Sequence, residues 1–377
     1  MKIEHKTEIL EKSVLKRQQK IVLELCESFL RKEKCNMDID ELVIDEMIKQ
    51  DMVELLASEM FIGVDSSYET IAKIKCQKNK SYYDFIYNEL KPIFVELNNL
   101  DYALTKGLLI ALYGYSNVEY RGTSDVDILV DKNDVAKVSK ILKKFGFRQG
   151  FIDEDGVFVE YQREQVLFFL TQTHQMAPYF KRTGNRIYPY VCVDVNFDLL
   201  WGETNFKVNV KDFLLNPHFK LFNDVRIKCL DLEKCVLHLC LHNYKENNSL
   251  YLLCNENCFK LRRYFDTMML LMNDEFDMMR FVNLVEKYDI CEYVYYSLYY
   301  AHFIFNYKMN SAFDNWCDKK LLQRYGLQDT EYKSWDSSFL ERVFDKAYID
   351  ALKNNFTDVE KAKIFANEEF MKRAAKK

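Results

Sequence analysis

The stretch Arg121–Val130, with the sequence RGTSDVDILV, decides the fold of this chain. Side chains alternate between the two faces of a strand, so Asp125 and Asp127 project from one face while Val126 and Ile128 point into a core. Two carboxylates held close together on a rigid strand repel each other unless a cation lies between them. Mg²⁺ suits such a pair and usually completes its shell with substrate phosphates. The stretch therefore predicts a strand that carries a phosphate-handling metal site.

Residues that suit phosphate binding lie upstream of the acidic pair. Arg121 and Ser124 precede it directly and offer a cation and a hydroxyl donor to phosphate oxygens. Further upstream, the apolar Tyr102–Leu104 is followed by Lys106 and Gly107, where a helix-like run begins. A glycine at a strand-to-helix junction lets backbone amides approach a phosphate, and the neighbouring lysine adds charge. We expect these two pairs of residues to bind substrate phosphates.

At this point the chain resembles the nucleotidyltransferase superfamily with the DNA polymerase beta-like fold. The likeness runs from about Leu100 to Phe147 and is closest to the bacterial family of uncharacterised nucleotidyltransferases. Members of that family carry a Lys-Gly turn, a tyrosine on the next helix, an arginine, an Asp-hydrophobic-Asp strand, and a helix ending in Gly-Phe or Gly-Tyr. The matching residues here are Lys106-Gly107, Tyr113, Arg121, Asp125-Val126-Asp127 and Gly146-Phe147. The superfamily more often has a Gly-Ser or Gly-Gly pair nearer the aspartates, where this chain has Gly107-Leu108 and a longer spacer.

The resemblance implies a third carboxylate on a neighbouring strand. The segment Tyr190–Leu199 alternates as a strand should, and Asp194, Asn196 and Asp198 share its polar face. Similar proteins have an aspartate followed two residues later by a histidine. Asp194 matches that aspartate, and Asn196 replaces the histidine. Asp194 is therefore the expected third acid, Asp198 is the second choice, and an ordinary solvent-facing acid is the alternative interpretation of Asp194.

The resemblance further implies a metal-dependent nucleotidyltransferase. Such an enzyme would move a nucleoside monophosphate from a nucleoside triphosphate, with ATP as the expected donor, to a hydroxyl of an unidentified small-molecule or protein acceptor, and would release pyrophosphate. Asp125, Asp127 and Asp194 would be catalytic and would hold Mg²⁺ or Mn²⁺, and Asp194 would also help remove the proton of the incoming hydroxyl. The main alternative is a non-catalytic, nucleotide-sensing or partner-binding relative of the antitoxin-like kind. Polymerisation on RNA ends is a third interpretation.

Composition limits the remaining possibilities. Hydrophobic residues make up 49% and charged residues 29% of the 377 residues, as in folded globular proteins. Only 4 Pro and 10 Gly are present, which favours a largely helical body. The net charge of −5 argues against a broad nucleic-acid surface, and 11 Cys without a Cys-x-x-Cys motif favour reduced thiols in the cytoplasm. We expect no membrane association, because residues 1–6 lack an apolar signal region and the apolar Tyr293–Tyr307 is too short to span a bilayer.

The periodicity of apolar residues predicts an α+β fold in which a small mixed sheet is embedded in a largely helical protein. The expected organisation is a helical N-terminal region at 1–98, a nucleotidyltransferase α/β core at 99–229 and a helical C-terminal domain at 230–377. Within the core we expect a helix at Val135–Phe145 and strands at Phe147–Ile152, Val157–Tyr161 and Val166–Gln172. Asp231 is the expected N-cap of the first C-terminal helix.

Overall fold

The structure, a computed structural model, describes residues 12–201, 208–254, 258–327 and 331–372. The chain divides into two compact units. Unit 1 consists of Met1–Lys78, Glu119–Arg121 and Leu239–Asn355, and unit 2 consists of Asn79–Val118, Gly122–His238 and Phe356–Lys377. Helices α4 (Ser66–Leu97) and α9 (Leu232–Asn248) contribute residues to both units. The three regions expected from the sequence are continuous segments of the chain, whereas each compact unit combines separate segments. The three-part organisation therefore stays a prediction.

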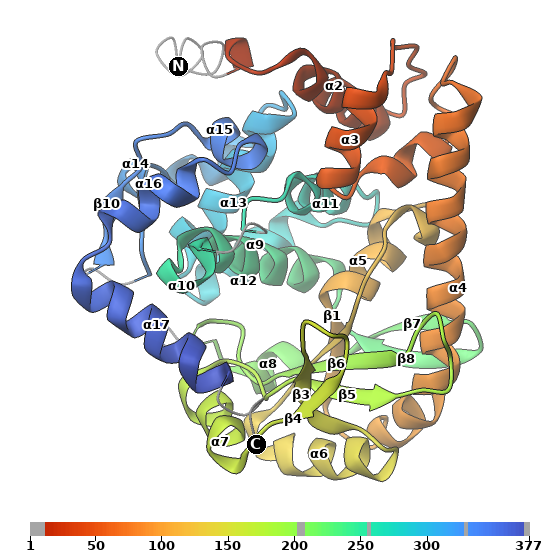
Figure 1. Ribbon diagram of the computed structural model, residues 1–377, viewed down its shortest axis with the longest axis vertical. Coiled ribbons are helices and arrows are strands. Elements are labelled where there is room, and N and C mark those ends of the chain that lie inside the picture. The colour runs from red at the N-terminus through yellow and green to blue at the C-terminus, as the bar shows by residue number, and fades with distance from the viewer. Residues whose placement is uncertain (1–11, 202–207, 255–257, 328–330, 373–377) are drawn as a thin grey trace. The chain divides into compact units, whose positions relative to one another are not determined.

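Unit 2 contains an eight-stranded mixed sheet within the described residues (Figure 1). Its strand order is β4-β3-β5-β6-β2-β1-β8-β7. The strands are β1 (Tyr102–Thr105), β2 (Val126–Val130), β3 (Arg148–Ile152), β4 (Phe158–Glu160), β5 (Tyr179–Arg182), β6 (Tyr190–Asn196), β7 (His218–Phe222) and β8 (Val225–Cys229). Two neighbouring pairs, β2 with β6 and β1 with β8, are parallel, and the others are antiparallel. The mostly helical chain with this sheet confirms the α+β class.

The central strands β1 and β2 are buried along their whole length, which shows that both faces of the sheet are covered at these strands. Strand β6 alternates between buried and half-buried residues up to Val195 and ends at the buried Asn196. The polar residues of these strands are therefore enclosed by apolar neighbours, and each needs a polar partner.

Most helices of unit 2 lie in the connections between strands, and one follows all the strands near the C-terminus. They are α5 (Lys106–Gly114), α6 (Val135–Lys144), α7 (Arg163–Gln172), α8 (Val210–Leu214) and α17 (Asp358–Lys372), with the short 3-10 turn η3 (Lys132–Asp134) before α6. Figure 1 shows α6 and α7 beside the strands of this unit. Helix α6 buries Val135, Val138 and Leu142, which recur at intervals of three and four residues and so form one apolar stripe.

Unit 1 is built mainly from helices. They are α2 (Arg17–Arg31), α3 (Glu41–Lys49), α10 (Leu250–Leu253), α11 (Leu261–Leu271), α12 (Met278–Lys287), α13 (Cys291–Ile304), α14 (Lys319–Gln323), α15 (Phe339–Phe344) and α16 (Tyr348–Asn355), with 3-10 turns η1 (Val53–Ala57) and η4 (Ser311–Trp316) and a small pair of strands, β9 (Arg324–Tyr325) and β10 (Lys333–Ser334). The turn η2 (Val118–Tyr120) begins in unit 2 and ends in unit 1. None of the described helices combines the length and the apolar character that a membrane span needs.

Most of the expected elements are confirmed, and one is wrong. Helix α6 and strands β3 and β4 lie where the sequence predicted them, and the Asp231 carboxylate accepts the N–H of Lys234 at 3.0 Å, as an N-cap should. The strand expected at Val166–Gln172 is instead part of helix α7. Its apolar residues are consecutive, so periodicity cannot separate strand from helix. The reciprocal capping bonds between Gln162 and Gln165 give the segment a helix start.

Candidate active site

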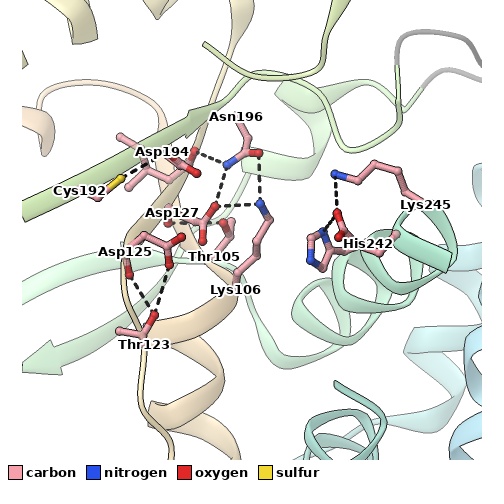
Figure 2. A network of polar contacts seen from close by, with 12 residues as sticks. Thr105, Lys106, Thr123, Asp125, Asp127, Cys192, Asp194, Asn196, His242 and Lys245 are labelled. Atoms are coloured by element: carbon pink, nitrogen blue, oxygen red, sulfur yellow. Dashed lines mark hydrogen bonds and ion pairs between the residues drawn. The ribbon is translucent and has the colours of Figure 1, made fainter. Parts of the chain in front are cut away.

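Two aspartates occupy matching positions on neighbouring strands. The parallel pairing of β2 with β6 puts the Cα of Asp127 in register with that of Asp194, and the antiparallel β1 puts Thr105 opposite Asp127. Asp125 lies one residue before β2, and Figure 2 shows it beside the other two acids. The sheet thus brings together three carboxylates that the sequence singled out from two distant segments.

Lys106 supplies a positive charge to this group. Its Nζ lies 2.8 Å from Asp127 Oδ1 and 3.4 Å from Asn196 Oδ1 (Figure 2). Lys106 begins helix α5 with φ of 47°, a left-handed conformation that a residue with a side chain adopts at a cost of roughly 1–2 kcal/mol. Strain of this kind concentrates at functional sites. The buried Gly107 follows directly, so the structure places both residues of the Lys-Gly turn at the strand-to-helix junction.

Asn196 is fully buried and completes the contacts of Asp127. Its Nδ2 lies 3.3 Å from Asp127 Oδ1, while its own Oδ1 accepts from Lys106. One carboxylate oxygen of Asp127 therefore receives two donors. The sequence analysis assigned Asn196 no role, because it stands where similar proteins have histidine. The strand alternation that gives Asp194 its polar face puts Asn196 on the same face and could have found it.

The acids interact strongly through a poorly solvated interior. Burial raises the pKa of the Asp194 carboxyl, and the charges of Asp127 and Asp125 add to this, so that the pKa reaches about 7. The ammonium of Lys106 and the thiol of Cys192, which lies 3.7 Å from Asp194 Oδ1, oppose the rise. For Lys106 itself, burial lowers the pKa, but the attraction of Asp127 outweighs it and the pKa is raised overall. Repulsion among the acids therefore persists despite the lysine.

Hydroxyl groups fix the loop that leads into β2. Thr123 Oγ1 lies 3.0 Å from the backbone oxygen of Asp125 and 3.4 Å from its Oδ1. Tyr82, on helix α4, donates its hydroxyl to the backbone oxygen of Ser124 at 2.9 Å. The sequence analysis missed Thr123 and Tyr82, since neither a lone threonine nor a distant tyrosine carries a recognisable pattern. Ser124 is exposed, and its expected contact with phosphate stays a prediction.

A family model described as uncharacterised nucleotidyltransferase matches residues 66–306, more than half of the 377-residue chain. The chain belongs to this nucleotidyltransferase family. The match confirms the resemblance seen in the sequence and makes the chain a transferase enzyme for which a nucleoside triphosphate is the implied substrate. It includes all the candidate residues between Lys106 and Asp198. No curated protein matches the chain.

Asp198 of this nucleotidyltransferase lies beyond the end of β6. Its Oδ1 accepts the N–H groups of Leu199 at 2.7 Å and Leu200 at 3.2 Å, which ties the carboxylate to the turn that follows the strand. Asp194, by contrast, is the register partner of Asp127. The geometry therefore favours Asp194 over Asp198 as the third acid of the transferase.

Arg121 of the nucleotidyltransferase belongs to unit 1, unlike the acids. Its guanidinium donates to Asp266 Oδ2 from Nε at 3.3 Å and from Nη2 at 3.1 Å, and the Asp266 side chain is 1% exposed. A buried carboxylate of this kind needs a cation. Arg121 thus has a structural partner that the sequence did not indicate, and its expected contact with phosphate stays a prediction.

The donor chemistry of the transferase fits a hard divalent cation. Carboxylates of Asp125, Asp127 and Asp194 and the amide oxygen of Asn196 are the oxygen ligands that Mg²⁺ and Mn²⁺ accept. The raised pKa of Asp194 reports a repulsion that a cation would relieve. Among the described residues, no three His, Cys, Asp or Glu side chains are already drawn together around one metal position. Asp127 is instead turned toward the ammonium of Lys106.

Proposed function

We propose that this enzyme moves a nucleoside monophosphate from a nucleoside triphosphate to a hydroxyl group of a small-molecule or protein acceptor and releases pyrophosphate. The observation that carries the proposal is the register of Asp127 and Asp194 on adjacent parallel strands, with Asp125 one residue before the strand that carries Asp127. Clustered carboxylates on a rigid sheet suit metal-assisted phosphate chemistry. ATP is the proposed donor.

Asp125, Asp127 and Asp194 are the proposed holders of Mg²⁺ or Mn²⁺. When bound, such an ion neutralises charge on the phosphate oxygens during in-line displacement. Lys106 and the backbone amides at the start of α5 are the proposed contacts of the triphosphate tail, because an ammonium and a helix N-terminus both attract phosphate. Arg121 and Ser124 are proposed to add a guanidinium and a hydroxyl to those contacts.

Asp194 is the proposed proton acceptor for the incoming hydroxyl. A general base must lie within hydrogen-bond reach of the proton that it removes, and the register of Asp194 with Asp127 puts its carboxylate beside the proposed metal-binding acids. The hydroxyl oxygen would bond to the α-phosphorus as its proton passes to Asp194. The bond from that phosphorus to the pyrophosphate oxygen would break in the same displacement.

A thermal-shift panel of the four ribonucleoside triphosphates, with and without Mg²⁺, tests the site. A ligand at about 100 times its dissociation constant stabilises a protein by about 2.7 kcal/mol, which raises the midpoint by several degrees. We expect a Mg²⁺-dependent rise with at least one triphosphate. Asp127→Asn should abolish it. Asp224→Asn, which changes an exposed aspartate of the same unit that pairs with Lys91, should not.

Labelled nucleotides test the direction of transfer. The enzyme would be incubated with Mg²⁺ and with ATP labelled at either the α- or the γ-phosphate, and offered fractions of small metabolites and of proteins as acceptors. Label from the α-phosphate should enter an acceptor while pyrophosphate is released. Transfer of the γ-label would refute the proposal.

Absence of a thermal shift with every triphosphate would instead favour a non-catalytic, partner-binding relative.

The proposed setting of the reaction is the cytoplasm, without bulk nucleic acid as a partner. All 11 Cys are free thiols, as expected for a reducing compartment. The net charge of −5 gives no general attraction to a polyanion.

A further inference from the structure

We propose that Tyr82, Phe85 and Tyr188 form the subsite that binds the nucleobase of the donor nucleotide. We call these three residues the aromatic cluster. The inference rests on the proposed function and deepens it. The carboxylates and Lys106 are the proposed contacts of the metal and the phosphates, and the aromatic cluster would bind the base.

The rings of the aromatic cluster come from two separate segments of unit 2. Tyr82 and Phe85 lie on helix α4, and Tyr188 lies in the connection between β5 and β6. Phe85 stacks on Tyr188 with ring centroids 5.2 Å apart and an interplanar angle of 28°. Tyr82 lies 5.2 Å from Tyr188 and 6.5 Å from Phe85. Each ring therefore touches both of the others.

The aromatic cluster is attached to the loop that carries the catalytic acid. The Tyr82 hydroxyl donates to the backbone oxygen of Ser124, the residue immediately before Asp125. Burial raises the pKa of that hydroxyl, and the charge of Asp125 is the next largest contribution. Close packing holds the loop against the same helix, since a Cβ on Gly122 would come within 2.8 Å of Asn79 Oδ1. In a nucleotide, only the ribose separates the base from the α-phosphate, so a base can reach rings placed this close to Asp125.

The turn that carries Tyr188 is fixed by its own hydrogen bonds. Asn185 Oδ1 accepts the N–H groups of Ile187 at 2.8 Å and Tyr188 at 3.1 Å, and Thr183 Oγ1 donates to the backbone oxygen of Tyr188 at 2.6 Å. A ring held in place before the ligand arrives loses little conformational entropy on binding. The turn therefore presents Tyr188 as a preorganised surface.

The exposure of the aromatic cluster distinguishes it from the aromatic core. All three of its rings are half-buried, whereas Tyr264 and Phe339, which pack edge-to-face in unit 1, are almost completely buried. A second half-buried aromatic group is formed by Phe151, Tyr161 and Phe169. That group lies on and after the outer strands β3 and β4, so it provides the matched control.

Stacking on aromatic rings gives affinity with little base selectivity. A base stacked on an aromatic side chain gains about 1–3 kcal/mol, and every base has a face that can stack. The larger ring system of a purine should stack better than that of a pyrimidine. The aromatic cluster therefore predicts that the enzyme accepts several triphosphates and binds purine nucleotides more tightly.

Calorimetric titration with ATP and with inorganic triphosphate, both with Mg²⁺, tests the subsite. In wild type, ATP should bind more tightly than triphosphate. Tyr188→Leu, which keeps the apolar bulk but removes the ring, should weaken the binding of ATP by about 5- to 100-fold and leave the binding of triphosphate unchanged. Tyr188→Phe should retain ATP affinity. Tyr161→Leu, in the control group, should change the affinity for neither ligand.

Each contrary outcome has a separate meaning. Equal binding of ATP and triphosphate in wild type, or unchanged ATP binding in Tyr188→Leu, would overturn the subsite and leave the proposed function standing. Unchanged ATP binding together with lost transfer would assign the ring to the acceptor, which also overturns the proposal. If neither ligand binds in the presence of Mg²⁺, the proposed function fails and the subsite fails with it.

Discussion

Replacement of Asp194 by asparagine should make the protein more stable, by an amount that grows with pH. Asp194 lies opposite Asp127 in a poorly solvated sheet, and burial followed by the charges of Asp127 and Asp125 raises its pKa from the ordinary 3.8 to about 7. Each factor of ten in proton affinity is worth about 1.4 kcal/mol. The ionised Asp194 therefore costs the folded protein at most about 4 kcal/mol, which asparagine would recover.

The pH dependence of this gain has a definite sign. Between about pH 4 and pH 7 the folded protein keeps a proton on Asp194 that the unfolded chain has released. The folded state binds more protons in that interval, so wild-type stability falls as the pH rises. The advantage of Asp194→Asn should be small near pH 4, grow up to about pH 7 and then stay constant.

Differential scanning calorimetry in EDTA from pH 4 to 8.5 measures the effect. A gain of 1 kcal/mol raises the midpoint by about 2–4 °C in a domain of 150–250 residues, so Asp194→Asn should melt several degrees above wild type at pH 8. Mg²⁺ should reduce the difference in melting temperature between Asp194→Asn and wild type, because a cation stabilises the ionised acids of wild type. Asp198→Asn is the control: it removes a carboxylate charge as well, but its amide oxygen can still accept the two backbone N–H groups, so it should not show a stability gain that grows with pH. An advantage of Asp194→Asn that is absent, or that does not change with pH, would refute the reasoning.

Three further substitutions test the contacts around the site and in unit 1. Lys106→Met leaves the buried Asp127 without its cation and should lower the free energy of unfolding by about 3–5 kcal/mol, measured by thermal denaturation at pH 8. Arg262→Met should lower the free energy of unfolding by a similar amount, because the Glu54 side chain, which is 2% exposed, loses the guanidinium that lies 3.2 Å from it. A second substitution in the same protein, Glu54→Gln, should restore part of the lost melting temperature. Gly122→Ala should cost about 1–3 kcal/mol by crowding Asn79, and Asn79→Ala in the same chain should relieve the loss. If Gly122→Ala melts like wild type, the loop is not tightly packed on α4.

The sequence predicted the strand of the acidic pair, the helices on either side of the core and the α+β class, because each depends on local periodicity. Helix α6 shows this well, because its buried residues recur at intervals of three and four, and strand β2 was indicated by an apolar run that only Asp127 interrupts. The sequence also selected Asp194, though only through resemblance. Helix α7 was predicted wrongly, because a consecutive apolar run fits either periodicity and only its capping residues identify the helix.

What the sequence could not predict depends on strand order. The contact of Lys106 with Asp127 and Asn196 exists because β1 and β6 flank β2, and no local pattern specifies that arrangement. The same holds for Tyr82 and Ser124, which lie far apart in the chain yet share a hydrogen bond. The left-handed backbone of Lys106 is likewise invisible, because nothing in its residue type favours φ of 47°.

The position of Lys106 follows from the repulsion that the sheet imposes on its acids. Pairing of β2 with β6 fixes Asp127 beside Asp194 whatever the charge of either group, so the fold itself enforces the conflict. A nearby cation favours ionisation of both acids, and the ammonium of Lys106, 2.8 Å from Asp127, provides part of that stabilisation. The charge of Lys106 does not compensate fully for the repulsion between the acids, since the pKa of Asp194 is still raised to about 7 with Lys106 in place. The divalent cation proposed for this site would supply the positive charge that the acids still lack after Lys106 is paired.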